Sequence, residues 1–356
     1  MYRNTYAEID LNNIISNVKA IINKYNDYKY YFGVVKADAY GHTDLKVVKA
    51  LIAAGCNYMA VSSLEEAIKI RKKFNNIPIL CLEPIDLKYI EKCIIYNITI
   101  TISSKEYLQN LLKNNCSNLK MHIKLDTGMN RLGIKDKEEF INVYNMIKNS
   151  SHYLEGIYSH IYWALNDSHT KEQLKKFENM ICDIDISSIP IIHISNSETL
   201  VKYKKMNIAN GVRLGIIMYG FTNDQSLELK STYKVISEII EIKEVKKGET
   251  IGYNGTYKAI KDIKIGIVPI GYADGIIRAN KGRYVIINDN KYPIVGNICM
   301  DMLMVHIDQS VQLYDKVYVI KDIKHINDIA KHTKTIPYEV ICMISKRVSK
   351  KYKISK

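Results

Sequence analysis

Short apolar runs alternate with amphipathic stretches between residue 30 and about residue 220. Most runs are continuously apolar and rich in β-branched residues, which is typical of parallel strands covered on both faces. The segments between them have apolar residues at helical intervals, and in one of them, 64–74, Ser63 and Glu66 have the spacing of a capping box. The eight predicted strands are 30–37, 58–63, 77–82, 98–103, 119–126, 154–161, 190–197 and 210–220.

This alternation predicts an α/β fold with an N-terminal (β/α)8 TIM-type barrel, although a doubly wound sheet would show the same alternation. Beyond about residue 228 the pattern changes to strand-rich segments separated by turns, and the tract Asn288-Asp289-Asn290 has hairpin-turn chemistry. We therefore expect a barrel domain over 10–228 and a C-terminal, mostly antiparallel β domain over 229–356, completed by a strand within 1–9.

Composition narrows the class of protein. The chain has 356 residues, of which 47% are hydrophobic and 25% charged, enough to bury a large core. Its seven cysteines are odd in number and include no C-x-x-C pair, which disfavours a disulfide framework, and we predict no metal site. Neither a signal peptide nor a long apolar span is visible, so a cytoplasmic protein without a membrane partner is expected. Lysines are spread along the chain despite a net charge of +14, so we predict no nucleic-acid partner; the basic tail from Lys346 to Lys356 could be tested by salt-dependent retention on DNA.

Lys36 lies in the apolar run GVVKA, at the end of the first predicted strand. Functional residues of such barrels gather at the C-terminal ends of the strands. Burial lowers the pKa of a lysine toward the nucleophilic free amine, which an aldehyde cofactor requires. The alternative is a lysine held in a salt bridge, with Asp38 or Asp126 as the partner.

A phosphate site is predicted after the seventh and eighth strands. Ser197 supplies a small hydroxyl, Gly215 and Ile216 can present backbone N–H groups, and Tyr40 adds a phenolic hydroxyl. The tract Ser195-Asn196-Ser197 is equally compatible with a plain helix N-cap.

An ordered set of motifs makes a family resemblance specific: KADAYGH, KLDTGMNRLGI, IHISNS, VRLGIIMYG, IGYNGTY, GYADG and GNICMDM. The chain resembles bacterial alanine racemases, fold-type III enzymes that use pyridoxal phosphate, over essentially its whole length. The resemblance implies an isomerase that interconverts L- and D-alanine and supplies D-alanine for peptidoglycan. It also implies a head-to-tail homodimer in which each active site takes residues from the partner.

The resemblance also implies the role of each site residue. Lys36 carries the cofactor as a Schiff base and is one catalytic base, while Tyr253, from the other subunit, is the second. Arg213 faces the pyridine nitrogen, and His160 is linked to that arginine. The phosphate-binding positions are Tyr40, Ser197, Gly215 and Ile216. The remaining matches are Arg131, Met300 and Asp301 near the substrate, Lys124 as a lysine often carbamylated in relatives, and Tyr272 and Arg278 along the substrate path.

These roles have a chemical reason. Racemisation removes a proton from one face of the α-carbon and returns one to the other face, so two bases are required. Both reference pKa values are about 10, so burial or nearby positive charge must bring each base into use. An arginine opposite the ring nitrogen donates a hydrogen bond without giving up its proton, which limits side reactions of the cofactor.

The sequence departs from the family pattern at three positions, and two alternative functions of proteins with a similar barrel need to be considered. Relatives commonly have tyrosine, arginine and glycine where this chain has Lys346, Asn297 and Thr43. Lys346 leaves room for a serine racemase or a broader small-amino-acid racemase. A fold-type III decarboxylase is disfavoured by Arg213, and a non-catalytic carrier of pyridoxal phosphate is disfavoured by the C-terminal domain.

Overall fold

The computed structural model describes residues 3–354, and the chain forms two compact units. The barrel unit comprises Ile14–Ala39 and Thr43–Lys230; the β unit comprises Met1–Asn13, Tyr40–His42 and Ser231–Lys356. The predicted boundaries near residues 10 and 228 stay predictions. Within the described residues, no helix is long and apolar enough to cross a membrane.

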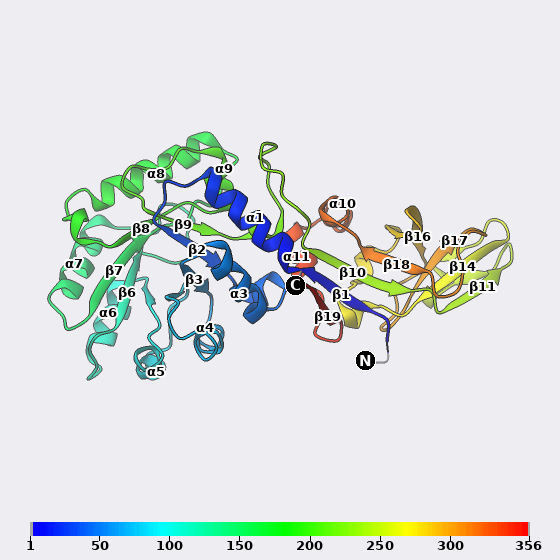
Figure 1. Ribbon diagram of the computed structural model, residues 1–356, viewed down its shortest axis with the longest axis horizontal. Helices are drawn as coiled ribbons and strands as arrows, with labels where there is room; N and C mark the ends of the chain where they lie inside the picture. Colours follow the sequence, from blue (N-terminus) through cyan, green and yellow to red (C-terminus); the bar gives the residue numbers. More distant parts are fainter. Residues whose placement is uncertain (1–2, 355–356) are drawn as a thin grey trace. The chain divides into compact units, whose positions relative to one another are not determined.

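The barrel unit confirms the predicted alternation of strands and helices (Figure 1). Its strands are β2 (Tyr30–Val34), β3 (Tyr58–Val61), β4 (Ile79–Cys81), β5 (Ile100–Ile102), β6 (Lys120–Lys124), β7 (Tyr153–Tyr158), β8 (Ile191–His193) and β9 (Gly211–Leu214). Its helices are α1 (Leu11–Lys24), which begins in the β unit, α2 (Lys36–Tyr40), α3 (Asp44–Ala54), α4 (Leu64–Arg71), α5 (Ile90–Ile95), α6 (Lys105–Leu112), α7 (Lys137–Lys148), α8 (Asp167–Ile181) and α9 (Ser197–Lys202), with short 3₁₀ turns η1 (Leu87–Tyr89), η2 (Ile186–Ser188) and η3 (Ile216–Tyr219).

The strands form a closed parallel barrel. The eight-stranded sheet has the order β4-β3-β2-β9-β8-β7-β6-β5, and a parallel bridge between Leu80 and Thr99 joins its two edges. Every residue of β3, β4, β5, β8 and β9 is buried, because the helices cover the outside while side chains fill the inside. The observed strands end before the predicted ones: β2 ends at Val34, so Lys36 lies beyond the strand, as the first residue of α2.

The β unit is mostly antiparallel, as predicted. Its main sheet has the order β11-β14-β17-β16-β15-β18-β10-β1-β19, in which β1 and β19 pair in parallel. The Asn288-Asp289 turn joins β15 to β16, and both residues have positive φ (48° and 63°), as a two-residue hairpin of this hand requires. The elements are β1 (Tyr6–Asp10), β10 (Tyr233–Glu238), β11 (Glu241–Val245), β12 (Thr250–Ile251), η4 (Tyr253–Gly255), β13 (Tyr257–Lys258), β14 (Ile263–Val268), η5 (Tyr272–Asp274), η6 (Arg278–Asn280), β15 (Tyr284–Ile287), β16 (Asn290–Val295), β17 (Leu303–Ile307), β18 (Lys316–Ile320), α10 (Ile323–Thr333), α11 (Pro337–Cys342) and β19 (Ser349–Lys353).

Candidate active site

Lys36 lies two residues beyond β2 and is half-buried. Its amine has no hydrogen-bond or ion-pair partner among the described residues. Asp38 instead lies 3.7 Å from Lys69 Nζ, and Asp126 Oδ1 accepts hydrogen bonds from the backbone of its own loop. The salt-bridge alternative for Lys36 is therefore not what the structure shows.

The residues after Lys36 form a left-handed turn. Ala37, Asp38, Ala39 and Tyr40 have φ values of 51°, 53°, 54° and 54°. Left-handed backbone costs an L-residue about 1–2 kcal/mol, so such residues occur singly in most proteins. A run of four is local strain, which persists only where the surrounding structure enforces it.

Glu66 contributes to holding this turn. The capping box predicted for α4 is present, with Glu66 Oε2 accepting from the backbone N–H groups of Ser62 (2.9 Å) and Ser63 (3.3 Å). Its other oxygen, Oε1, accepts from Ala37 N at 2.7 Å. One carboxylate thus ties the start of α4 to the residue that follows Lys36.

In the tract after β8, neighbouring residues make different hydrogen bonds. Asn196, rather than Ser197, is the N-cap of α9 and accepts from the backbone of Glu198 and Thr199. The buried Ser197 hydroxyl accepts from Gly215 N at 3.0 Å, at the start of η3, which Ile216 opens. The loop after β9 and the start of α9 therefore lie together within the barrel unit.

Tyr40, the other predicted phosphate ligand, belongs to the β unit by its contacts. It is 8% exposed, and its ring lies 5.9 Å from that of Tyr338. Burial, followed by the neighbouring Tyr338, raises the pKa of Tyr40 well above its usual value. Its hydroxyl therefore keeps its proton and can act as a hydrogen-bond donor.

Arg213 is buried and its two terminal nitrogens are fully engaged. Nη1 lies 2.7 Å from His193 Nδ1, while Nη2 donates to Ser159 O (2.7 Å) and Ile194 O (3.0 Å) and lies 3.4 Å from His160 Nδ1. Nε has no partner among the described residues, so it is the nitrogen left for a ligand. Burial lowers the pKa of Arg213 to about 10, which leaves the guanidinium charged at neutral pH.

Two further charged groups influence this region. Lys124, at the end of β6, is 6% exposed, and burial, then the charges of Arg131 and Arg213, lower its pKa to about 8. The pKa of His160 lies well below its usual value because of burial and the same two arginines. His160 is therefore neutral, and a fraction of Lys124 is a free amine at mildly alkaline pH.

The remaining predicted residues lie in the β unit and are largely exposed. Tyr253, in η4, is 70% exposed, and its carbonyl accepts from Asn297 Nδ2 at 2.9 Å. Met300 is 53% exposed, and the carboxylate of Asp301 lies 2.7 Å from Arg347 Nη2. Tyr272, Arg278 and Lys346 are also exposed in this unit.

Three buried polar residues near Arg213 escaped the sequence reasoning. His193, His122 and Glu155 lie inside β8, β6 and β7 and form a connected set of hydrogen bonds. A titratable residue within an apolar strand is costly unless it has a partner, so all three carry the same signal in the sequence as Lys36 does.

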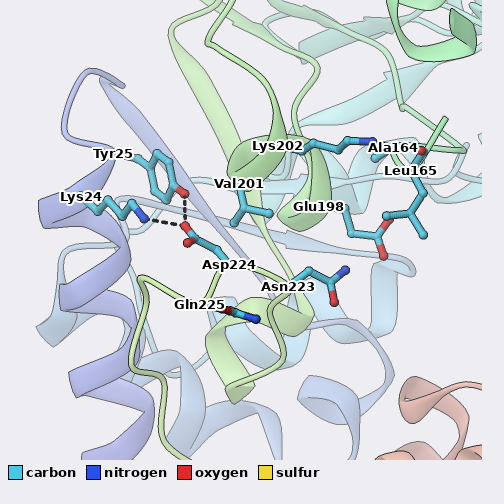
Figure 2. A pocket seen from close by; sticks show the side chains of 10 residues that line it. All are labelled: Lys24, Tyr25, Ala164, Leu165, Glu198, Val201, Lys202, Asn223, Asp224 and Gln225. Carbon is cyan, nitrogen blue, oxygen red and sulfur yellow. Dashed lines mark hydrogen bonds and ion pairs between the residues drawn. The ribbon is translucent and has the colours of Figure 1, made fainter. Parts of the chain in front are cut away.

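The barrel unit has a hollow of about 550 Å³ whose charged lining residues are held in ion pairs (Figure 2). Asp224 lies at its wall, 2.5 Å from Lys24 Nζ and 3.0 Å from the Tyr25 hydroxyl. Lys202, on the opposite wall, lies 2.7 Å from Asp167 Oδ1. Because these charges are compensated within the barrel unit, the hollow is not a candidate active site.

Comparisons with known proteins agree with the geometry. Residues 9–223 match the family model described as alanine racemase, N-terminal domain, and residues 232–352 match alanine racemase, C-terminal domain. Alanine racemase 1 of Bacillus subtilis is 35% identical over 99% of this chain and 93% of its own length. Alanine racemase 1 of Clostridium acetobutylicum is 37% identical over 98% and 95%.

Solved structures give the same relationship. The crystal structure of alanine racemase from E. faecalis has a TM-score of 0.94 and 32% identity, with 99% of each chain covered. The Bacillus anthracis alanine racemase, solved with bound L-Ala-P, has a TM-score of 0.92 and 31% identity over 99% of this chain and 96% of its own.

Proposed function

Because the chain belongs to the alanine racemase family, we propose that it is a pyridoxal-phosphate isomerase that interconverts L-alanine and D-alanine. The observation that carries this proposal is the similarity over the full length of both chains to proteins named alanine racemase. We propose further that the product supplies peptidoglycan synthesis in the bacterial cytoplasm. Serine is not favoured as the main substrate, since these relatives are named for alanine.

The chemistry of the residues in the barrel unit fits pyridoxal phosphate. Lys36 offers an unpaired amine for the aldehyde, and the charged Arg213 has a single unused donor, Nε, for a ring nitrogen. The Ser197 hydroxyl, whose oxygen accepts from Gly215 N, can donate its own proton to a phosphate, and the backbone N–H of Ile216 offers a second donor. Gly215 and Tyr40, the latter in the β unit, are proposed as further phosphate-binding positions on the family motifs alone. When bound, the cofactor withdraws electrons from the α-carbon of the amino acid and thereby makes its proton removable.

In the proposed mechanism two residues of this chain move the proton. Lys36 Nζ takes or returns it on one face of the α-carbon, and Tyr253 Oη serves the opposite face. Arg213 would donate Nε–H to the ring nitrogen when the cofactor is bound and would keep its proton, since its pKa of about 10 stays above neutral pH. His160 is a neutral neighbour of that arginine. These assignments rest on the family motifs and on the chemistry of each side chain.

Arg131, Met300 and Asp301 are proposed to hold the substrate. Arg131 is exposed, and its guanidinium can bind a carboxylate in a bidentate manner. Lys124 is proposed to be carbamylated: the neutral amine forms an N–C bond to carbon dioxide and releases one proton to solvent, and a pKa of about 8 makes the neutral form accessible. The resulting carbamate would give Arg131 an anionic partner.

We propose a homodimer in which Tyr253 completes the site of the other subunit. The large exposed fraction of Tyr253 and Met300 supports this proposal, because apolar side chains of this size gain free energy when a partner covers them. A mixture of Lys36→Ala and Tyr253→Phe proteins tests it. Heterodimers would contain one site with both bases, so random mixing should restore about one quarter of the wild-type sites. Failure to restore any activity after subunit exchange would contradict a shared site.

The racemase assay follows circular dichroism of L-alanine and L-serine separately, with protein purified in the presence of pyridoxal phosphate. We expect a coloured protein that racemises L-alanine faster than L-serine. Lys36→Ala should lose both colour and activity, while Tyr253→Phe should keep the colour and lose about 10²–10⁴-fold in rate. Tyr257→Phe, in the adjacent strand β13, is the matched control and should retain activity. A colourless protein, or one that racemises neither amino acid, would refute the proposal.

A further inference from the structure

Four buried side chains form a continuous hydrogen-bonded chain inside the barrel. Arg213 Nη1 lies 2.7 Å from His193 Nδ1, His193 Nε2 lies 3.0 Å from His122 Nδ1, and His122 Nε2 lies 3.2 Å from Glu155 Oε2. None of the four is more than 8% exposed, and both histidines are fully buried. We call these residues the barrel relay. They come from β9, β8, β6 and β7, and the family assignments above use only Arg213.

The chemistry of the donors fixes every proton in the barrel relay. Arginine only donates, so His193 Nδ1 must be the acceptor and the ring proton of His193 must lie on Nε2. His193 Nε2–H then donates to His122 Nδ1, which places the proton of His122 on its own Nε2. That proton points at Glu155. Both histidines are therefore neutral Nε2–H tautomers, and all three hydrogen bonds run in one direction.

Glu155 is ionised at the end of the relay. Its Oε2 also accepts from the Tyr58 hydroxyl (2.5 Å) and from Thr99 Oγ1 (2.9 Å). Burial raises the pKa of Glu155, but the hydrogen bonds that it accepts from His122, Tyr58 and Thr99 favour the carboxylate and hold its pKa below the usual value. Burial lowers the pKa of both His122 and His193, so the negative charge is not neutralised by a neighbouring imidazolium at neutral pH.

Arg213 has no other counter-ion among residues 3–354. Its other hydrogen-bond partners there are backbone carbonyls and the neutral His160. A buried guanidinium without a negative charge is costly, and a charge can act at a distance through polarised hydrogen bonds where the dielectric constant is low. Lys120 Nζ lies 3.8 Å from Glu155 Oε1, but its side chain is 38% exposed, so solvent screens that pair.

The surrounding packing is shaped to hold the two imidazoles. The His193 ring is stacked between those of Phe32 (4.6 Å, 16°) and Tyr158 (4.7 Å, 12°). A Cβ at Gly156 would lie 2.6 Å from His122 Cε1, so only glycine leaves room for that ring. The β6–β7 register shifts at this point: Met121 pairs with Leu154 and His122 with Gly156, so Glu155 is the extra residue of a bulge. Bulges re-aim side chains in this way.

We propose that Glu155 is the counter-ion of Arg213, acting through the neutral His122 and His193, and that this barrel relay positions Arg213 so that Nε–H alone remains for a ligand. The three residues are positioning residues, since none of them is argued to touch the substrate or the cofactor. Their relevance to catalysis rests on the proposed function, whereas their protonation states do not.

Nitrogen NMR of full-length protein labelled with [¹⁵N]histidine tests the proton positions directly. Signals of His122 and His193 are assigned from their loss in single His→Gln variants. We expect each ring to carry its proton on Nε2 and to remain neutral at neutral pH. An Nδ1–H tautomer or an imidazolium at either position would overturn the proposal, whether or not the protein racemises alanine.

Two substitutions at the same carboxylate separate a relay from simple filling of the barrel. Glu155→Gln removes the charge and retains an acceptor, whereas Tyr58→Phe retains the charge and removes one donor. In Glu155→Gln we expect the Nε2 protons of both histidines to move upfield as their hydrogen bonds weaken, and kcat for alanine to fall about tenfold with little change in KM. Tyr58→Phe and the exposed control Glu65→Gln should leave the His193 proton signal and kcat near wild type.

The pattern of responses identifies which idea fails. If only the His122 signal moves in Glu155→Gln, or if Tyr58→Phe has the same effect on His193 and kcat, the carboxylate acts locally and the relay is refuted. If wild-type protein shows the expected tautomers but does not racemise alanine, the proposed function fails while the relay stands. Should Glu155→Gln not fold, the tautomers of the unsubstituted protein still decide the proton positions.

Discussion

The left-handed turn after Lys36 predicts an unusual response to glycine. Ala37 and Ala53 are both exposed alanines of the barrel unit, but Ala37 has φ 51° in the left-handed turn, whereas Ala53 lies within the right-handed helix α3. Ala39, by contrast, is fully buried, so its substitution would also remove packing. The pair Ala37→Gly and Ala53→Gly therefore differs mainly in the hand of the backbone.

The magnitude follows from two opposing contributions. In α3, glycine costs about 1 kcal/mol relative to alanine, because the unfolded glycine chain has more conformations to lose. The same entropic cost applies at position 37, but there the left-handed backbone destabilises alanine by about 1–2 kcal/mol and does not destabilise glycine. Ala37→Gly should therefore leave the stability unchanged or raise it by up to about 1 kcal/mol. The hydrogen bond from the position-37 N–H to Glu66 is retained in the variant.

Urea unfolding of both variants, monitored through the transition of the barrel unit, measures the difference. We expect Ala37→Gly to be more stable than Ala53→Gly by about 1–2 kcal/mol, a factor of about 5–30 in the unfolding constant. The unfolded-state term is common to the two variants and cancels in this comparison. Equal destabilisation by the two substitutions would refute the reasoning, because the left-handed turn would then carry no strain that glycine can relieve.

Three further predictions concern single residues. Thr43 has φ 76° and makes no side-chain cap hydrogen bond, so Thr43→Gly should stabilise the fold by about 1 kcal/mol and raise the melting temperature. The control Ser104→Gly should lower the melting temperature, because the Ser104 side chain caps its helix by accepting from Tyr107 N at 3.1 Å. Folding lowers the pKa of Lys124 from 10.5 to about 8, so below pH 8 the buried charge costs the folded protein about 3 kcal/mol of stability in the absence of carbon dioxide. Lys124→Met should raise the free energy of unfolding by that amount below pH 8. Wild-type stability rises with pH from 8 to 10.5, so the difference between variant and wild type should vanish over that range in urea titrations, and a difference independent of pH would contradict this reasoning. Asn297→Ala removes the hydrogen bond to the Tyr253 carbonyl, so the free energy of unfolding of the β unit should fall by about 1 kcal/mol. An unchanged free energy of unfolding would mean that water replaces this hydrogen bond.

Much of the fold was readable from the chain. Strands covered on both faces leave continuous apolar runs, so the strands of the barrel could be counted and ordered before the structure was known. Local chemistry also predicted the capping box of Ser63 and Glu66 and the hairpin at Asn288-Asp289, because both depend only on residues a few positions apart. The family motifs pointed to Lys36, and its place after a buried strand follows from the same pattern.

Other features depended on partners far apart in the sequence. The periodicity of a strand reports burial but not which side chains meet, so the contact of His193 with Arg213 and the bulge that turns Glu155 toward His122 were invisible. The left-handed backbone at Ala37 contradicts the helical preference of alanine and exists only because the surrounding contacts enforce it. The sequence by itself thus determined the elements, and it singled out Lys36 as the proposed reactive lysine. The tertiary structure alone decided the left-handed backbone of the turn after Lys36 and the hydrogen-bond partners that set the tautomers of His193 and His122. Both depend on long-range packing and hydrogen bonding rather than on local propensity.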